Sequence, residues 1–324
     1  MRALVLGASG GMGYALVKEL SSRDVEVVAF SRSQEKLSEL FQKDKNVTIH
    51  PGDALKMQDI LEASENVDII YHALNVPYPE WSAKLATIMN NVLTAAEKQR
   101  AKVAYVDNIY AYGRGQSNKK ITEDTPKEPH TKKGKIRLEL ETLAKQSPAP
   151  VVIAHFPDFY GPNADNAMLY YTMKDVIANK KASIVGDPYT AKEVIYTPDG
   201  AKALIELSLR DDAYNQNWNI PATDVITGME FVQKMRDITG YDKQVGTITK
   251  RMIKFLGFFN AGMKEVVEMF YLIENPVVLS GAKYEREIGE LPKTPYEVGI
   301  RETIEFYTNK AKRESTKQLS STTK

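Results

Sequence analysis

The chain begins Met1-Arg2-Ala3-Leu4-Val5-Leu6-Gly7-Ala8-Ser9-Gly10-Gly11-Met12-Gly13, and this stretch decides the fold. A short apolar run, then closely spaced glycines, then the amphipathic segment 14–20 predict a buried strand, a tight turn and a helix. Gly7 lets the chain turn sharply, Gly10 lets the backbone approach a pyrophosphate, and Gly13 lets the helix pack closely on the strand. The phosphate would lie at the positive helix N-terminus. The sequence therefore predicts a nucleotide-binding βαβ unit.

Glycines at this spacing also occur in turns that bind nothing, so the context decides between the two interpretations. A second apolar run, residues 25–30, follows where the second strand of a dinucleotide fold is expected. After it the chain continues Ser31-Arg32-Ser33, with Lys36 one turn further on, where an NAD site usually has a carboxylate. Ser31 and Arg32 therefore favour NADP over NAD, and the alternative is a solvated loop with an ordinary arginine.

Composition narrows the functional classes. Among 324 residues, 43 Lys and Arg balance 42 Asp and Glu, which gives no support for a nucleic-acid partner. The chain has no cysteine, and its four histidines lack ligand spacing, so we expect no metal site. It has no charged leader and no apolar run of about eighteen residues, which predicts a cytoplasmic protein without a membrane partner.

Further apolar runs at 47–50, 67–73, 102–106 and 151–156 alternate with helical segments. Six such strands predict an α/β fold with a Rossmann-type doubly wound parallel sheet. The alternation fails after residue 156. We expect an NAD(P)-binding domain at 1–156, its sheet completed by segments near 190–222, and a smaller interleaved substrate-binding lobe mainly at 157–307. The Ser-, Thr- and Lys-rich segment 308–324 is expected to be a disordered tail.

Residues just past the strand ends should face the ligand crevice. Asp53 is placed to meet the adenine edge, or to cap a helix that starts near Ala54. Helix 81–98 carries a broad apolar face, which is either core or part of a dimer seam. A homodimer through helices 81–98 and 131–145 is a further hypothesis.

Five motifs occur along the chain: Gly7-x-x-Gly10-x-x-Gly13, Gly52-Asp53, Tyr112-Gly113, Phe159-Tyr160-Gly161-Pro162 and Tyr196-Thr197-Pro198-Asp199. Together they resemble the extended short-chain dehydrogenases/reductases, the group of NAD-dependent epimerases and dehydratases. The resemblance covers roughly residues 1–305 and implies a small C-terminal lobe that binds a small-molecule substrate, often a nucleotide sugar.

Catalysis in this family normally uses a Ser or Thr with a Tyr-x-x-x-Lys pair, in which the phenolate moves a proton while the nicotinamide exchanges hydride. All three positions differ here: they hold Asn108, Lys133 and Arg137. Tyr170 and Lys174 have the family spacing but lie on another helix, where a surface pair is the better interpretation.

Four interpretations remain open. The chain is a divergent oxidoreductase or epimerase in which Lys133 replaces the tyrosine, its pKa lowered by Arg137. It is a catalytically inactive NADP-binding sensor. It anchors an anionic substrate with Asn108, Lys133 and Arg137 while Tyr112 or Tyr160 acts. Lastly, Lys133 and Arg137 form a solvated helix face, with Arg137 paired to Glu141.

The motifs and the resemblance together give the expected cofactor site. Its members are Gly7, Ser9, Gly10, Gly11, Met12, Gly13, Ser31, Arg32, Asp53, Ala54, Ala73, Leu74, Asn75, Lys133, Phe156 and Pro157.

Overall fold

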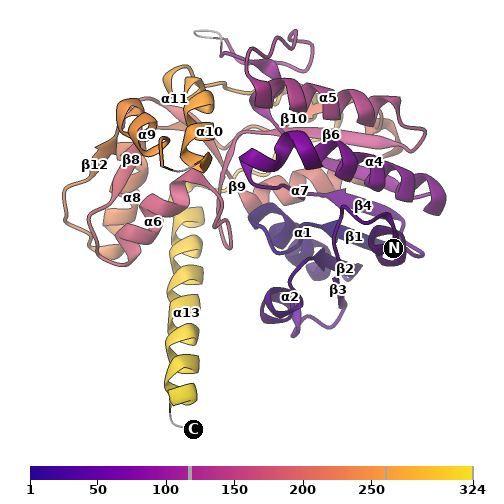
Figure 1. Ribbon diagram of the computed structural model, residues 1–324, viewed down its shortest axis with the longest axis horizontal. Coiled ribbons are helices and arrows are strands. Elements are labelled where there is room, and N and C mark those ends of the chain that lie inside the picture. Colours follow the sequence, from indigo (N-terminus) through magenta and orange to yellow (C-terminus); the bar gives the residue numbers. More distant parts are fainter. Residues whose placement is uncertain (116–118, 260, 323–324) are drawn as a thin grey trace.

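The computed structural model describes residues 1–115, 119–259 and 261–322 (Figure 1). In this part of the chain, the central sheet has seven parallel strands in the order β10-β6-β5-β4-β1-β2-β3. The doubly wound α/β fold is therefore confirmed. The strands are β1 (Arg2–Leu6), β2 (Glu26–Ser31), β3 (Val47–Pro51), β4 (Ile69–His72), β5 (Lys102–Asn108), β6 (Val151–Phe156) and β10 (Asn217–Asn219).

Helices cover both faces of this sheet, because side chains alternate along a strand. In β1, Ala3 and Val5 face one core and Leu4 and Leu6 face the other. The first core is covered by α1 (Gly11–Ser22), α2 (Gln34–Phe41) and α7 (Thr197–Ser208). The second is covered by α3 (Met57–Ala63), α4 (Trp81–Gln99) and α5 (Lys132–Gln146). Short 3-10 turns are η1 (Tyr78–Glu80), η2 (Ile109–Tyr112) and η3 (Asp211–Ala213).

The apolar face of α4 belongs to this second core. Its members Leu85, Ile88, Met89, Val92, Leu93 and Ala96 are all buried against the sheet. The core interpretation of this stripe is confirmed, so the stripe itself offers no dimer seam.

The smaller lobe lies beside the carboxyl-terminal edge of the sheet, with its helices at the left in Figure 1. It contains the sheet β11-β9-β7 and the pair β12-β8. Its strands are β7 (Asp158–Tyr160), β8 (Ser183–Val185), β9 (Lys192–Tyr196), β11 (Val225–Ile226) and β12 (Gly246–Ile248). Its helices are α6 (Met168–Ile177), α8 (Gly228–Thr239), α9 (Lys250–Leu256), α10 (Ala261–Met269), α11 (Tyr271–Glu274) and α13 (Tyr296–Thr322), while α12 (Ala282–Glu287) packs on β10.

Interleaving arises because β9 pairs within the lobe and leads directly into α7, which packs on α1 of the large domain. Of the segments near 190–222, only β10 joins the central sheet, as a seventh strand beside β6. The sequence pattern yields six strands because β10 is three residues long, too short to form a periodic signal.

The predicted disordered tail differs from the structure. Residues 308–322 continue α13, and only 323–324 lie outside the described residues. Two contacts tie the beginning of this segment to the lobe: Tyr307 donates to Asp165 Oδ1 at 2.7 Å, and Lys310 Nζ lies 3.2 Å from Asp165 Oδ2. Polar composition suggested disorder, but Glu, Lys, Arg and Ala are also good helix formers, and α13 contains no proline.

Candidate functional site

The glycine-rich turn connects β1 to α1. Gly7 has φ +83°, and its N–H donates to the carbonyl of Phe30 at 3.0 Å, which fixes the turn against the end of β2. A Cβ on Gly7 would lie 2.8 Å from Leu74 Cα, and one on Gly13 would lie 2.1 Å from Gly7 O. A Cβ on Gly10 would meet only Gly7 O, at 3.4 Å. The backbone at Gly10 is thus open to a ligand, while Gly7 and Gly13 are constrained by packing.

Gly13→Ala is expected to destabilise the fold, because the added methyl would press on backbone rather than on a flexible side chain. Overpacking costs about 1 to 3 kcal/mol, and contact with rigid backbone places Gly13→Ala at the upper end of this range. Gly10→Ala is the matched control and should change the free energy of unfolding by about 1 kcal/mol or less, since its Cβ has room. Urea denaturation of both variants measures the difference, and equal stabilities would contradict this packing argument.

The start of α1 fits an anionic group. Its first turn has no acidic residue, and Gly10 provides no side-chain cap. The N–H groups of a first helical turn lack intrahelical acceptors, so a phosphate can take their place. Nearby, Ser31 Oγ is buried without a hydrogen-bond partner among the described residues, whereas Arg32 is exposed. Three features therefore fit a bound dinucleotide: the open backbone at Gly10, the uncapped start of α1 and the unpaired hydroxyl of Ser31.

The other expected cofactor residues form two groups, one in the loop after β4 and one of buried residues. Ala73, Leu74 and Asn75 follow β4, and Ala73 and Leu74 lie beside the turn at Gly7. Asn163 reaches the same turn through Nδ2, which donates to Ser9 O at 3.0 Å. Met12, Ala54, Phe156 and Pro157 are buried, and the side chains of Met12 and Phe156 belong to the core. Gly11 packs against Ala164, since a Cβ there would lie 2.7 Å from Ala164 Cα.

Asp53 does not cap a helix that starts near Ala54, because α3 begins at Met57. Its Oδ1 instead accepts from Leu55 N at 3.0 Å, which stabilises the turn before the helix.

Lys133 and Arg137 are buried on α5, with 1% and 4% of their surfaces exposed, so their interpretation as a solvated helix face is wrong. Lys133 Nζ pairs with Glu265 and Glu268 of α10, the latter at 2.5 Å, and lies 5.1 Å from the ring centroid of Tyr78. Glu268 Oε1 also accepts from the backbone of Lys132 and Lys133 at the start of α5. Burial by itself would raise the pKa of Glu268. Hydrogen bonds from Lys133 and from these backbone amides nevertheless hold that pKa below its usual value.

Arg137 does not pair with Glu141. Its Nη1 donates to Tyr105 Oη at 2.9 Å and to Asp107 Oδ1 at 3.3 Å, and Nη2 donates to Asn75 Oδ1 at 3.3 Å. Its guanidinium carbon lies 4.4 Å from the Trp81 ring centroid. Arg137 therefore joins β5 to the loop after β4, next to the expected cofactor turn.

Asn108, Tyr112 and Tyr160 make other contacts. Asn108 Oδ1 accepts from Tyr110 N at 3.0 Å and so caps η2. Tyr112 donates to Asn219 Oδ1 at 2.9 Å, and Tyr160 packs among the aromatic residues of the lobe core. These partners differ from those of Lys133, which are Glu265, Glu268 and Tyr78. The Tyr170–Lys174 surface pair is observed, with Nζ 5.9 Å from the ring centroid.

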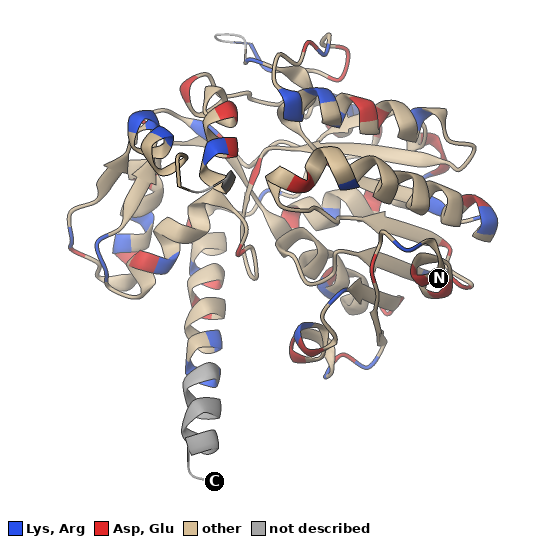
Figure 2. Cartoon of the chain, in the orientation of Figure 1, with Lys and Arg blue, Asp and Glu red and all other residues tan. Residues whose placement is uncertain are grey.

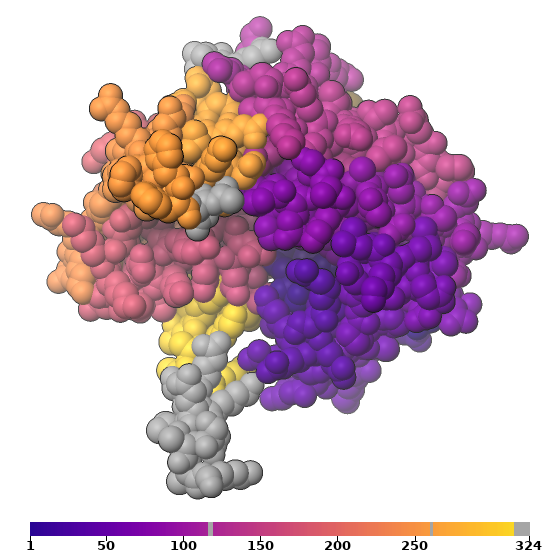
Figure 3. All heavy atoms as spheres, viewed as in Figure 1, coloured from indigo at the N-terminus to yellow at the C-terminus, as the bar shows by residue number. Residues whose placement is uncertain are grey.

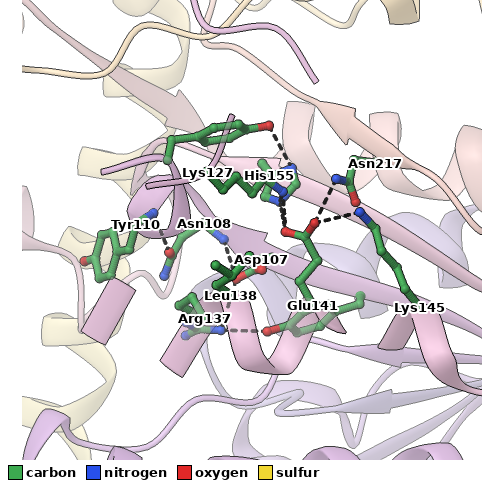
Figure 4. Close-up of polar contacts among 12 residues, drawn as sticks. Asp107, Asn108, Tyr110, Lys127, Arg137, Leu138, Glu141, Lys145, His155 and Asn217 are labelled. Atoms are coloured by element: carbon green, nitrogen blue, oxygen red, sulfur yellow. Dashed lines mark hydrogen bonds and ion pairs between the residues drawn. The ribbon is translucent and has the colours of Figure 1, made fainter. Parts of the chain in front are cut away.

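Glu141 occupies a second buried cluster, shown in Figure 4. Its carboxylate contacts Lys127, Lys145 at 2.8 Å, Asn217 at 2.9 Å and His155 at 3.2 Å. Although burial alone would raise it, His155 and Lys127 hold the pKa of Glu141 well below its usual range. Asp107, Glu141 and His155 are close enough to ligate a cation, but the Lys127 ammonium already lies between Glu141 and His155. The Lys127 ammonium therefore already supplies the positive charge of this cluster.

A cavity of about 340 Å³ is lined by Lys132 and by Glu268, the ion-pair partner of Lys133. Four basic side chains line it beside the start of α5: Arg114, His130, Lys132 and Lys250. Sequence reasoning missed this cavity and the partners Tyr78, Trp81, Glu265 and Glu268. Their spacing along the chain carries no signal, because the ion pairs of Lys133 join residues 132 and 135 positions apart.

The doubly wound sheet and the glycine-rich turn after β1 together define a Rossmann-type α/β protein of the nucleotide-binding class. The family model for the NAD dependent epimerase/dehydratase family matches residues 3–220, and the chain belongs to this family. It is 23% identical over 265 residues to human dTDP-D-glucose 4,6-dehydratase, covering 76% of this chain and 71% of the relative. It is 21% identical over 276 residues to Escherichia coli dTDP-4-dehydro-6-deoxyglucose reductase, covering 75% and 85%.

Solved structures show the same fold. UDP-glucuronic acid 4-epimerase from Bacillus cereus, in complex with NAD, has a TM-score of 0.78 at 16% identity, covering 95% of this chain and 99% of that one. UDP-glucose 4-epimerase from Thermotoga maritima, with UDP-glucose, has a TM-score of 0.78 at 18% identity, covering 96% and 100%. The resemblance inferred from the motifs is confirmed, and the family consists of enzymes.

Proposed function

We propose that the chain is a divergent NADP-dependent oxidoreductase or epimerase in which Lys133 replaces the family's tyrosine as the proton carrier. One observation carries this proposal: Lys133 and Arg137 are buried on consecutive turns of α5, and Arg137 contacts Asn75 in the loop that follows β4. That loop lies against the glycine turn expected to hold the cofactor.

The chemistry assigned to the chain's own residues is proton transfer. When bound, the nicotinamide cofactor supplies or accepts a hydride. Lys133 Nζ, held by Glu265 and Glu268, would donate its proton to the carbonyl oxygen of the substrate, which becomes an alcohol, and would regain a proton from water. Arg137 keeps its charge and would fix the loop beside the reacting groups.

The adjoining cavity supports an anionic small-molecule substrate, such as a nucleotide sugar. Arg114 and Lys132 would attract its phosphates, and Glu268, which lines the cavity, is hydrogen-bonded to Lys133. Turnover assays with nucleotide sugars and with small aldehydes or ketones, in the presence of NADPH, test the proposal.

The second candidate is an NADP-binding sensor without turnover. It is favoured by the two carboxylates that already bind the Lys133 ammonium and compensate its charge. Wild-type protein that binds NADPH but converts no substrate in the same assays would support this alternative.

The cofactor preference gives a direct prediction. We expect tighter binding of NADPH than of NADH, because Ser31 ends β2 and Arg32 follows it, where a carboxylate would favour the bare ribose. A charge-assisted bond of this kind is worth roughly 1.5 to 3 kcal/mol, about tenfold or more in affinity. Arg32→Glu should reverse the order in calorimetric titrations, with Arg100→Glu at the end of α4 as the control. Equal affinities of the wild type for both cofactors would exclude the NADP preference.

A homodimer through α4 and α5 and a cytoplasmic location also belong to this proposal. For the dimer, the half-buried Leu138 and Leu143 supply apolar surface on α5. Light scattering at micromolar concentration measures the mass, and a monomer would exclude the dimer.

A further inference from the structure

The segment around α9 exposes apolar side chains to an unusual degree. Five of the twelve large hydrophobic side chains exposed in the described part of the chain lie between residues 252 and 259. Phe258 and Phe259 are 83% and 81% exposed. Single exposed apolar residues are ordinary, but a contiguous patch indicates an interaction surface. We call this group the α9 patch: Met252, Phe255, Leu256, Phe258 and Phe259, with the exposed cations Arg251 and Lys254.

The charge of this segment is strongly one-sided. Residues 243–264 contain five Lys and Arg and no Asp or Glu, although the whole chain has a net charge of only +1. The acidic residues that follow this segment have other partners, since Glu265 and Glu268 bind Lys133 and Glu274 binds Lys250 at 2.9 Å. Arg251 and Lys254 therefore present positive charge next to exposed phenylalanines, and the blue segments of α9 in Figure 2 mark this region.

The patch is fixed to the lobe. Ile253 of α9 is buried and packs with Phe270 and Ile273 in a small separate core. Phe255 and Phe259 also contact each other, with ring centroids 5.8 Å apart. Phe255 thus lies on a helix that is anchored to the lobe, and Phe258 and Phe259 follow in the turn after it, in the orange segment of Figure 3.

We propose that the α9 patch docks the protein onto anionic lipid bilayers. Aromatic and aliphatic side chains beside Lys and Arg are the composition of elements that lie in the membrane interface, and anionic headgroups complement the cations. A second copy fits less well, because a twofold contact would place the patch against itself and bring like charges together. The proposal concerns contact with the bilayer surface. Among the described residues, no helix combines the length and apolar character of a membrane span.

Sedimentation of the full chain with vesicles tests the proposal. We expect binding to phosphatidylcholine vesicles that contain phosphatidylserine, weaker binding to phosphatidylcholine alone, and weaker binding at high salt. Arg251→Glu/Lys254→Glu should lower the partition coefficient at least roughly twentyfold, since each cation near an anionic surface contributes about fivefold. Phe258→Ser/Phe259→Ser should lower it roughly tenfold or more.

Matched controls change the same kinds of residue elsewhere. Leu209→Ser, at an apolar side chain 50% exposed after α7, and Lys98→Glu, at the exposed end of α4, should bind like the wild type. Unchanged melting temperatures establish that the variants are folded. Absence of binding to phosphatidylserine vesicles would overturn the proposal, as would equal binding by the double serine variant. A wild-type dimer that this variant converts to monomer would assign the patch to a second copy instead.

Discussion

Glu141→Gln is expected to lower the free energy of unfolding by about 3 kcal/mol, the cost of leaving a buried charge without its partner. The carboxylate is 3% exposed and contacts Lys127, His155 and Lys145. Without its charge, the Lys127 ammonium keeps the cost of its burial and loses most of its compensation. Thermal or urea denaturation measures the change, with Glu139→Gln at an exposed position of the same helix as control.

The same contacts predict how stability depends on pH. The pKa of Glu141 in the folded chain lies well below its ordinary value of 4.5, so the carboxylate contributes fully to stability above pH 4.5. That contribution is lost as the pH falls further, because the unfolded chain then binds a proton that the folded chain does not. In the Glu141→Gln variant, the free energy of unfolding should therefore fall less steeply as the pH drops below 4.5. An unchanged pH dependence in the variant would contradict the assignment.

A double substitution tests whether Glu141 and Lys127 contribute to stability as a pair. If Lys127 is destabilising once unpaired, Glu141→Leu/Lys127→Met should be more stable than Glu141→Leu alone. Additive losses would mean that the two residues act independently.

Lys133→Met is expected to reduce kcat by roughly 10²- to 10⁴-fold, the usual contribution of a general acid or base. NADPH binding should change little, because the proposed cofactor contacts at the glycine turn and at Arg32 remain. Methionine keeps most of the buried chain length, and the carboxylates left behind are partly exposed, with side chains at 32% and 26%. Steady-state kinetics and calorimetry on the same preparation measure the two effects.

The control is Lys135→Met, an exposed lysine on the same helix. It should retain wild-type kcat and KM. If Lys133→Met keeps full turnover, Lys133 is not the proton carrier; if the wild type itself is inactive but binds NADPH, the sensor function gains support.

Local patterns in the sequence were sufficient for the large domain. Strand periodicity and the glycine spacing predict β1, the turn and α1, and six of the seven parallel strands, because these features depend on residues within one βαβ unit. Gly7 and Gly13 are constrained for the reasons the spacing suggests, a positive φ and a close helix contact. The departure from the family's catalytic residues at 108, 133 and 137 is likewise visible in the sequence alone.

Tertiary structure decided what surrounds those positions. On the sequence, Lys133 and Arg137 form one charged face with Glu141 next in line, yet the structure gives each a separate set of partners. Lys133 meets α10, Arg137 meets β5 and the loop after β4, and Glu141 meets His155 and Asn217 from two further strands. Helical spacing fixes only which side of α5 these residues share. Which charges they meet depends on segments up to 135 residues distant, brought together by packing of the sheet and lobe rather than by any local pattern.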